Sequence, residues 1–144
     1  MTTKIKVSIK KNVATINIEN PNSLNSIDYQ GWLTLASMAI DLDKSPEVRA
    51  VIFSGSGNKS FSAGADIKEF PKTRYDIKTG IKYSNALHNA LDTIESIKCP
   101  TISLIKRICM GGGCELAITT DIRIASENST FGIPVAKLGI LVGY

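Results

Sequence analysis

The sequence predicts an α/β fold in which strands alternate with helices and pair in parallel. Residues 5–20 hold two runs of alternating apolar and polar residues on either side of Lys11 and Asn12, a pattern typical of two antiparallel strands. Further along, apolar residues recur at helical spacing in 27–42 and 83–97, and short apolar runs stand between these stretches. Strands and helices that alternate in this order indicate a parallel sheet after the first strand pair.

The first half of the chain continues with turn residues, "PNSLNS", at 21–26. The helix expected at 27–42 ends at "DKSPE", and we expect its Trp32 to lie in the core. A short apolar strand, "VRAVIFSG", follows at 48–55. The next stretch, "SGNKSFSAGAD" at 56–66, is expected to be a glycine-rich loop.

The second half begins with the clearest helix, whose apolar face runs from Tyr83 to Ile97 and which Pro100 stops. Three further elements are expected: a strand at 101–108 ("TISLIKRI"), a helix that starts in 112–120 ("GGCELAITT") and a strand at 121–126 ("DIRIAS"). The remaining residues, 131–144, are apolar and carry no polar tail, which predicts either a C-terminal strand or, as we favour, packing against further chain.

Length and composition exclude several classes of protein. A chain of 144 residues with 43% hydrophobic and 21% charged residues suits one soluble globular domain. "MTTKIKVSIK" lacks the apolar region of a secretory signal, and no apolar run approaches the roughly 20 residues of a membrane span. Three cysteines without zinc-type pairing favour free thiols and a reducing, cytoplasmic location. The net charge of +4 comes from scattered lysines that are not interleaved with aromatic residues, so no nucleic-acid surface is expected.

Three consecutive glycines, Gly111 to Gly113, precede Glu115 in "CMGGGCEL". A phosphate-binding loop would need a Lys-Ser or Lys-Thr pair after the second glycine, and a dinucleotide fingerprint would need glycine or alanine in place of Leu116. Neither is present. Glycines at a helix start can instead leave backbone N–H groups open to a single developing negative charge. Close helix packing is the alternative use of these glycines.

Glu115 also allows two interpretations. As a first-turn glutamate it would be stabilised by the helix dipole by about 0.3–1 kcal/mol. Its apolar neighbours suggest burial, which can raise a carboxyl pKa by up to about 3–5 units and so suits proton transfer near neutrality. If the site is closed to water, we expect the increase in pKa caused by burial to exceed the stabilisation of the ionised carboxyl by the helix dipole.

A second glycine-flanked stretch, "FSAGADIKEF" at 61–70, would supply another backbone donor. Together with "CMGGGCELA" at 109–117 and "PNSLNS" at 21–26, it resembles the crotonase (enoyl-CoA hydratase/isomerase) family, with the three motifs in the family's order. The resemblance implies that 1–144 form a crotonase-like spiral of repeated ββα units, without the family's C-terminal helical region. It also implies a coenzyme A (CoA) thioester as substrate, no separate cofactor or metal, and a trimer or a hexamer.

The resemblance further implies roles for particular residues. The backbone N–H groups of Ala65 and Gly112 would hold the thioester oxygen as it becomes an enolate, and Glu115 would move the proton. The residues implied to bind substrate or CoA are Ser23, Leu24, Ala63, Ala65, Asp66, Ile67, Lys68, Gly111 and Gly112.

Two positions depart from the family pattern. Val135 stands where hydratases of the family carry a second glutamate, and valine cannot transfer a proton. Lys106 and Arg107 stand in a strand-to-loop turn where the family commonly has a glycine. The first departure leaves an enoyl-CoA isomerase, a CoA thioester hydrolase or a catalytically weak CoA-binding protein as alternatives to an enoyl-CoA hydratase.

The remaining candidates are expected to be structural. Cys114 near a helix start could be a nucleophile with His88, the sole histidine, but a buried thiol and a solvated histidine are favoured. We expect Asp66 to cap a helix and Asp121 to have a structural role.

Overall fold

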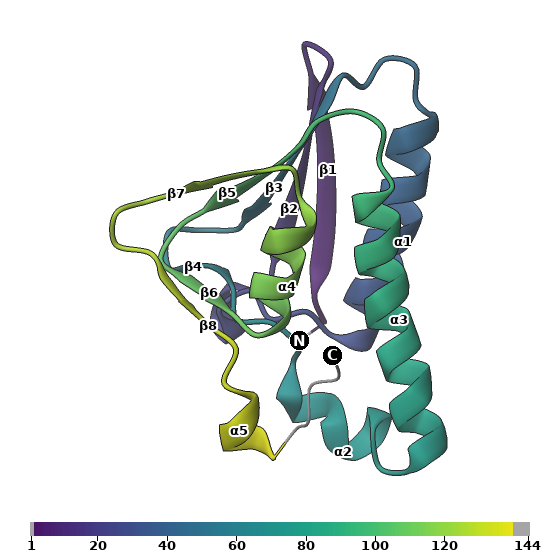
Figure 1. Cartoon of the computed structure of the whole chain (residues 1–144), viewed down its shortest axis with the longest axis vertical. Helices are drawn as coiled ribbons and strands as arrows, with labels where there is room; N and C mark the ends of the chain where they lie inside the picture. Colours follow the sequence, from purple (N-terminus) through teal and green to yellow (C-terminus); the bar gives the residue numbers. More distant parts are fainter. Residues whose placement is uncertain (1, 140–144) are drawn as a thin grey trace.

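The computed structural model describes residues 2–139 and contains two sheets (Figure 1). The larger sheet has the order β1-β2-β3-β5-β7, and the smaller one has the order β4-β6-β8. Only β1 and β2 are antiparallel, whereas all other neighbouring strands are parallel, which confirms the predicted pairing. The strands of the larger sheet are β1 (Lys4–Lys10), β2 (Val13–Glu19), β3 (Ala50–Gly55), β5 (Thr101–Ile105) and β7 (Ile122–Ala125). Those of the smaller sheet are β4 (Ser60–Ser62), β6 (Ile108–Met110) and β8 (Thr130–Gly132).

The chain repeats one unit: a strand of the larger sheet, a strand of the smaller sheet, and then a helical segment. The helices are α1 (Tyr29–Lys44), α2 (Phe70–Thr73), α3 (Ile77–Glu95), α4 (Gly112–Thr119) and α5 (Val135–Leu138), with 3-10 turns at Pro21–Ser23 and Ile67–Glu69. The units are therefore β3-β4-α2-α3, β5-β6-α4 and β7-β8-α5, as the expected spiral of ββα units requires. No fixed period is visible in the sequence because α3 has 19 residues whereas α4 has 8 and α5 has 4.

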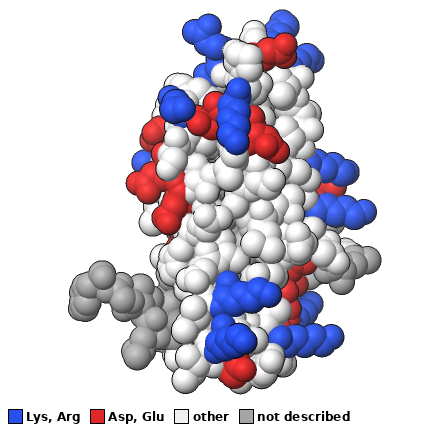
Figure 2. Space-filling model, turned by 90° about the vertical axis from the view of Figure 1, so that its right-hand side faces the viewer, with Lys and Arg blue, Asp and Glu red and all other residues white. Residues whose placement is uncertain are grey.

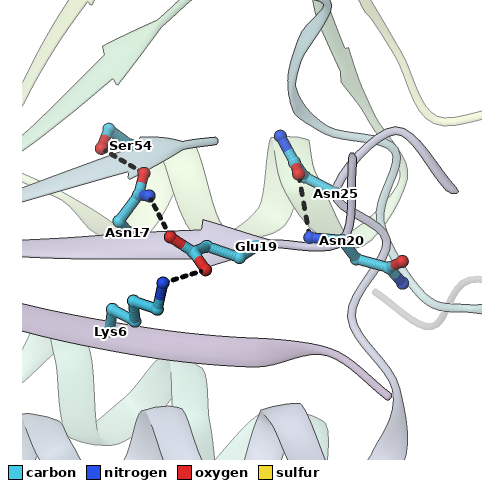
Figure 3. Close-up of polar contacts among 6 residues, drawn as sticks. All are labelled: Lys6, Asn17, Glu19, Asn20, Asn25 and Ser54. Atoms are coloured by element: carbon cyan, nitrogen blue, oxygen red, sulfur yellow. Dashed lines mark hydrogen bonds and ion pairs between the residues drawn. The ribbon is translucent and has the colours of Figure 1, made fainter. Parts of the chain in front are cut away.

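The opening hairpin is the element that local sequence determines best. Lys11 and Asn12 both have positive φ, 48° and 65°, the backbone that a tight two-residue hairpin turn requires. On the adjacent strands, Lys6 pairs with Glu19 at 2.7 Å, and Glu19 accepts a hydrogen bond from Asn17 at 3.2 Å (Figure 3). The lysine is the main reason that the pKa of Glu19 is lowered.

The two long helices lie side by side and cover the core (Figure 1). Asp28 caps α1 by accepting a hydrogen bond from the Gly31 N–H, so this helix spans 29–44 rather than the predicted 27–42. Asp76 and Thr79 form a capping box, so α3 begins before the predicted apolar face. Figure 2 shows the side of the molecule that carries these helices, where uncharged surface separates charged groups at the two ends.

Two predicted elements were wrong in detail, and one of the two interpretations of the C-terminal stretch is excluded. The single strand expected at 101–108 is two strands in different sheets, because the chain bends at Arg107, whose φ is 53°. The glycine-rich loop expected at 56–66 contains β4, which is too short to show a strand pattern. In the 131–144 stretch, β8 ends at Gly132 and α5 follows, so a continuous terminal strand is excluded up to residue 139, and 140–144 lie outside the described residues.

A buried asparagine fixes the turn between β2 and α1. Asn25 is fully buried, and its side-chain oxygen accepts a hydrogen bond from the Asn20 N–H at 3.0 Å (Figure 3). Its amide group donates to the carbonyl oxygens of Ser56 and Ser60 at 2.9 and 3.0 Å. The turn at 21–26 is thereby tied to both ends of the β3–β4 connection.

We expect Asn25→Ala to lower the free energy of unfolding by about 1–3 kcal/mol, because it leaves buried backbone groups without partners. Urea unfolding followed by circular dichroism would measure the change. Asn89→Ala, at an exposed position of α3, is the matched control and should stay within about 0.5 kcal/mol of the parent protein. Equal stability of the two variants would contradict the role given to Asn25.

Candidate functional site

Two loops meet where β4 and β6 end. These strands are parallel neighbours, so the residues after Ser62 and those after Met110 emerge at the same edge of the smaller sheet. The first loop carries Ala63 to Asp66, and the second carries the glycine run that opens α4. The fold therefore brings together the two motifs that are far apart in the sequence.

The contact between the loops is so close that it requires glycine. Gly64 has a φ of +87°, and a Cβ on it would lie 2.6 Å from both the Gly112 nitrogen and the Met110 oxygen. A Cβ on Gly113 would lie 2.5 Å from the Ser62 oxygen. Close packing, one of the two uses expected for the glycines, is thus confirmed for Gly113.

Gly112 lies against Trp32 and next to the Ala65 nitrogen. A Cβ on Gly112 would lie 2.9 Å from Trp32 Cζ2 and 3.5 Å from the Ala65 nitrogen. Trp32 is fully buried, as predicted, and its ring forms the floor beneath this point. The loops thus bring Gly112 close to the Ala65 nitrogen.

Both of these N–H groups are open. Gly112 is the first residue of α4, so its N–H has no partner within the helix. The flanks of Ala65 are fixed, because the Asp66 N–H donates to Ile27 O at 2.9 Å and the Ile27 N–H donates to Gly64 O at 2.7 Å. Within residues 2–139, neither the Ala65 nor the Gly112 N–H donates a hydrogen bond. Ala65 and Gly112 therefore each carry an N–H group without a partner in the described part of the chain, where the two loops meet.

Glu115 lies in the first turn of α4 and is half-buried. Burial raises the pKa of its carboxyl above the usual 4.5, and the nearby His88 acts in the opposite direction. The direction of this shift is the one expected from desolvation of the carboxyl. His88 is exposed, as predicted, and its Nδ1 lies 3.2 Å from Ser84 Oγ, but its effect on Glu115 was missed.

The raised pKa of Glu115 makes stability depend on pH. Because the folded carboxyl holds its proton more tightly than the unfolded one, the stabilisation is full below pH 4.5 and is lost as the pH rises through the folded pKa. Glutamine cannot ionise, so we expect Glu115→Gln to raise Tm relative to the parent, by an amount that grows with pH above 4.5. Scanning calorimetry over this range, with Glu95→Gln as the control, would measure it. A Tm difference independent of pH would contradict the assignment.

The residues implied to bind CoA come from segments of the chain that contact one another. The Ala63 N–H donates to Leu24 O at 2.9 Å, which joins the turn at Ser23 and Leu24 to the first loop. Asp66 accepts a hydrogen bond from the Lys68 N–H at 3.2 Å, which confirms it as a cap. The next two side chains, Ile67 and Lys68, are exposed.

The second loop also contacts these segments. A Cβ on Gly111 would lie 3.9 Å from Ala63 O, and Gly111 has a φ of 50°. Its N–H donates to Gly132 O at 2.8 Å. Val135, which stands where hydratases of the family carry a second glutamate, lies three residues after Gly132, at the start of α5. The segment that leads to Val135 therefore begins beside the glycine run.

The alternative nucleophile is not supported by its surroundings. Cys109 and Cys114 are buried, and all three cysteines of the described chain are free. The Cys114 thiol donates to Cys109 O at 2.8 Å, so it has a backbone partner inside the fold. Asp121 accepts hydrogen bonds from the N–H and hydroxyl of Thr101, both at 2.8 Å, which confirms its structural role.

Sequence reasoning missed two contributors to the site, Ser62 and Glu69. Ser62 donates to Asn25 O at 2.7 Å and accepts from the Gly64 N–H at 3.1 Å, which holds the first loop. Glu69 accepts a hydrogen bond from the Tyr29 N–H at 2.6 Å, and burial raises its pKa. Their roles depend on contacts between distant segments, and only the glycine flanked by small residues in "FSAGAD" signalled a close approach.

Residues 2–139 contain neither a membrane-spanning helix nor a cluster of metal-ligating side chains. No helix in this range is long and apolar enough to cross a membrane. Nor do three or more His, Cys, Asp or Glu side chains gather there as a metal site would require.

Comparison with known sequences places the whole arrangement in a family. Residues 8–144 match the family model described as "Enoyl-CoA hydratase/isomerase". A probable enoyl-CoA hydratase of Mycobacterium bovis is 34% identical over 139 residues, which cover 96% of this chain and 52% of the relative. A short-chain-enoyl-CoA hydratase of Clostridium acetobutylicum is 36% identical over 132 residues, which cover 92% of this chain and 50% of the relative. The chain therefore spans about half the length of these curated relatives.

Solved structures show the same fold. An enoyl-CoA hydratase/carnithine racemase from Magnetospirillum magneticum superposes with a TM-score of 0.93 at 31% identity, over 97% of this chain and 52% of that one. An enoyl-CoA hydratase from Bacillus anthracis superposes with a TM-score of 0.88 at 28% identity, over 94% of this chain and 52% of that one. The two sheets, the paired loops and the sequence match agree, and the chain belongs to the enoyl-CoA hydratase/isomerase family.

Proposed function

We propose that this chain provides the catalytic core of an enoyl-CoA hydratase that works through a thioester enolate. The observation that supports the proposal is that Ala65 and Gly112, on two loops that meet beside Trp32, each carry an N–H group without a partner in residues 2–139. Two preorganised donors at one point stabilise an oxygen that gains negative charge, which is what a thioester carbonyl does as it becomes an enolate. Curated relatives named as enoyl-CoA hydratases support the substrate class.

Glu115 supplies the proton chemistry in this proposal. Its carboxylate takes a proton from water while the water oxygen bonds to C3 of the enoyl group. The electron pair of the C2–C3 double bond moves towards the thioester oxygen, which the Ala65 and Gly112 N–H groups hold. When the enolate collapses, C2 takes the proton from Glu115, so one water is added and the carboxylate is restored. A pKa raised by burial lets one group both accept and return the proton.

Val135 favours a second candidate. With no carboxylate at that position, a reaction that needs only one proton-transfer group becomes the natural alternative. In a double-bond isomerase, Glu115 would take a proton from C2 of a 3-enoyl thioester and return it at C4, through the same enolate. Both candidate reactions would use Ala65, Gly112 and Glu115, and only the hydratase adds water to the substrate.

The CoA moiety would lie along the joined surface of 23–24 and 63–68, with Lys68 close to its phosphates. No further cofactor is needed for either reaction, since acid–base transfer and the two donors suffice. An assembly of three or six copies remains a prediction from the family, and light scattering would measure it.

Purified protein should be tested with crotonyl-CoA and with 3-enoyl-CoA. Loss of the enoyl-thioester absorbance with formation of 3-hydroxyacyl-CoA would support the hydratase, and conversion of 3-enoyl-CoA to 2-enoyl-CoA would support the isomerase. Release of free CoA would show hydrolysis. Binding by calorimetry without turnover would leave a CoA-binding protein, and absence of both would contradict the proposal.

A further inference from the structure

Two cysteines bracket the glycine run that carries the Gly112 donor. Cys109 lies in β6, before Gly111, and Cys114 lies in the first turn of α4, directly after Gly113. Both side chains are buried, and both are free thiols. The reaction proposed above uses neither of them, although they are the two sulfur atoms next to the open donor.

The chain turns back so sharply at this point that each thiol contacts the backbone of the other segment. The Cys114 thiol donates to Cys109 O at 2.8 Å. The Cys109 thiol donates at 3.4 Å to Gly113 O, the carbonyl that directly precedes Cys114. Burial, and after it the neighbouring Cys114 thiol, raises the pKa of Cys109. The reciprocal contacts therefore place the two thiols beside each other.

We propose that Cys109 and Cys114 are a site of reversible oxidation, at which a disulfide closes across the glycine run. Cys114 is 8% exposed and Cys109 is 0% exposed, so a small oxidant such as hydrogen peroxide reaches Cys114 first. The Cys114 sulfur bonds to one peroxide oxygen and the O–O bond breaks, which gives a sulfenic acid and one water. The Cys109 sulfur then bonds to the Cys114 sulfur, and the hydroxyl leaves as a second water with the Cys109 proton.

The disulfide changes the turn that holds Gly112. Once the sulfurs are bonded, neither can donate to Cys109 O or Gly113 O, and the two ends of the run are drawn together. Gly113 has little room to move, because a Cβ on it would lie 2.5 Å from Ser62 O. The change therefore falls on Gly111 and Gly112, whose backbone is free to rotate. Oxidation thus displaces the Gly112 N–H group.

Peroxide treatment of Cys99→Ser tests the proposal, because this variant retains only the two cysteines of the pair. Mass spectrometry of the denatured, unreduced protein should show the loss of two hydrogen atoms, and titration should find no free thiol. The ring spans only 109–114, so the disulfide stabilises the fold little, and dithiothreitol should restore both thiols.

The fluorescence of Trp32 reports on Gly112 without requiring any activity. Trp32 is the only tryptophan, and a Cβ on Gly112 would lie 2.9 Å from its ring. We expect its emission to change on oxidation and to recover with dithiothreitol. Turnover of crotonyl-CoA should fall in parallel by about 10²-fold, the effect of losing one donor. Only this last measurement rests on the proposed function.

Cys109→Ala in the Cys99→Ser background is the matched control, and Cys109→Ser serves if the alanine variant unfolds. Either variant should gain oxygen at Cys114, form no disulfide within the chain and keep the emission of the reduced protein. Three results in Cys99→Ser would overturn the proposal: persistence of both thiols, oxygen on Cys114 without a disulfide, or a disulfide between chains only. A disulfide within the chain that left the emission unchanged would overturn the effect on Gly112.

Discussion

Glu115→Gln is expected to lower kcat on an enoyl-CoA substrate by about 10²–10⁴-fold, the usual contribution of a positioned proton-transfer group. Glutamine keeps the shape of the side chain in the first turn of α4 but cannot accept or return a proton. Affinity for CoA should change little, because the two backbone donors and the surface at 63–68 are untouched. Steady-state kinetics with a separate calorimetric measurement of CoA affinity would distinguish the two effects.

Asp66→Asn is the matched control for this variant. Asp66 directly follows the donor loop, but its carboxylate accepts a hydrogen bond from the Lys68 N–H as a cap. We therefore expect this variant to retain most of kcat, and any loss to appear in the affinity for CoA, which Asp66 is implied to bind. If Glu115→Gln kept full turnover and Asp66→Asn lost it, the assignment of the proton-transfer group would be wrong.

Gly112→Pro should reduce kcat by about 10²–10³-fold through the loss of one donor to the enolate oxygen. Steric damage must be separated from this effect, because any Cβ at this position would lie 2.9 Å from Trp32 Cζ2. Gly112→Ala introduces the same contact but keeps the N–H group. The ratio of kcat values between the alanine and proline variants therefore isolates the donor.

A second substitution, at Trp32, separates the steric effect of a Cβ at position 112 from the loss of the N–H donor. Trp32→Phe removes the ring edge that a Cβ would strike, so it should restore activity to Gly112→Ala but not to Gly112→Pro. Circular dichroism would verify that each variant is folded. Equal losses in the alanine and proline variants, with equal recovery by Trp32→Phe, would show that the Gly112 N–H group takes no part.

The sequence predicted those parts of the fold that depend on local pattern. Lys11 and Asn12, which have positive φ, form the tight turn between the two alternating strands. The apolar face of α3 is long enough to predict a helix from the sequence alone. The 101–108 strand was predicted as one element because its apolar run is continuous. Its division at Arg107 follows from pairing with β4 and β8, which no local pattern records.

The sequence likewise predicted those parts of the candidate site that depend on local pattern. Glycines in two motifs indicated open backbone, and Glu115 stood out as a carboxylate among apolar residues. The fit of Gly64 against Gly112, and the position of Trp32 against Gly112, depend on contacts between segments that are far apart in the sequence. Neither the distance between the loops nor the effect of His88 on Glu115 follows from spacing along the chain.

The division of the site between two ββα units has a consequence for the order of folding. The β1–β2 hairpin closes over a two-residue turn, so it can form early and independently of the rest. The pairing of β4 with β6 instead closes a loop that contains α2, α3 and β5, and closing such a loop costs more entropy and is slower. We therefore expect the Ala65–Gly112 pair to appear late in refolding, after the hairpin and α3, so that recovery of ligand binding lags behind recovery of helical signal.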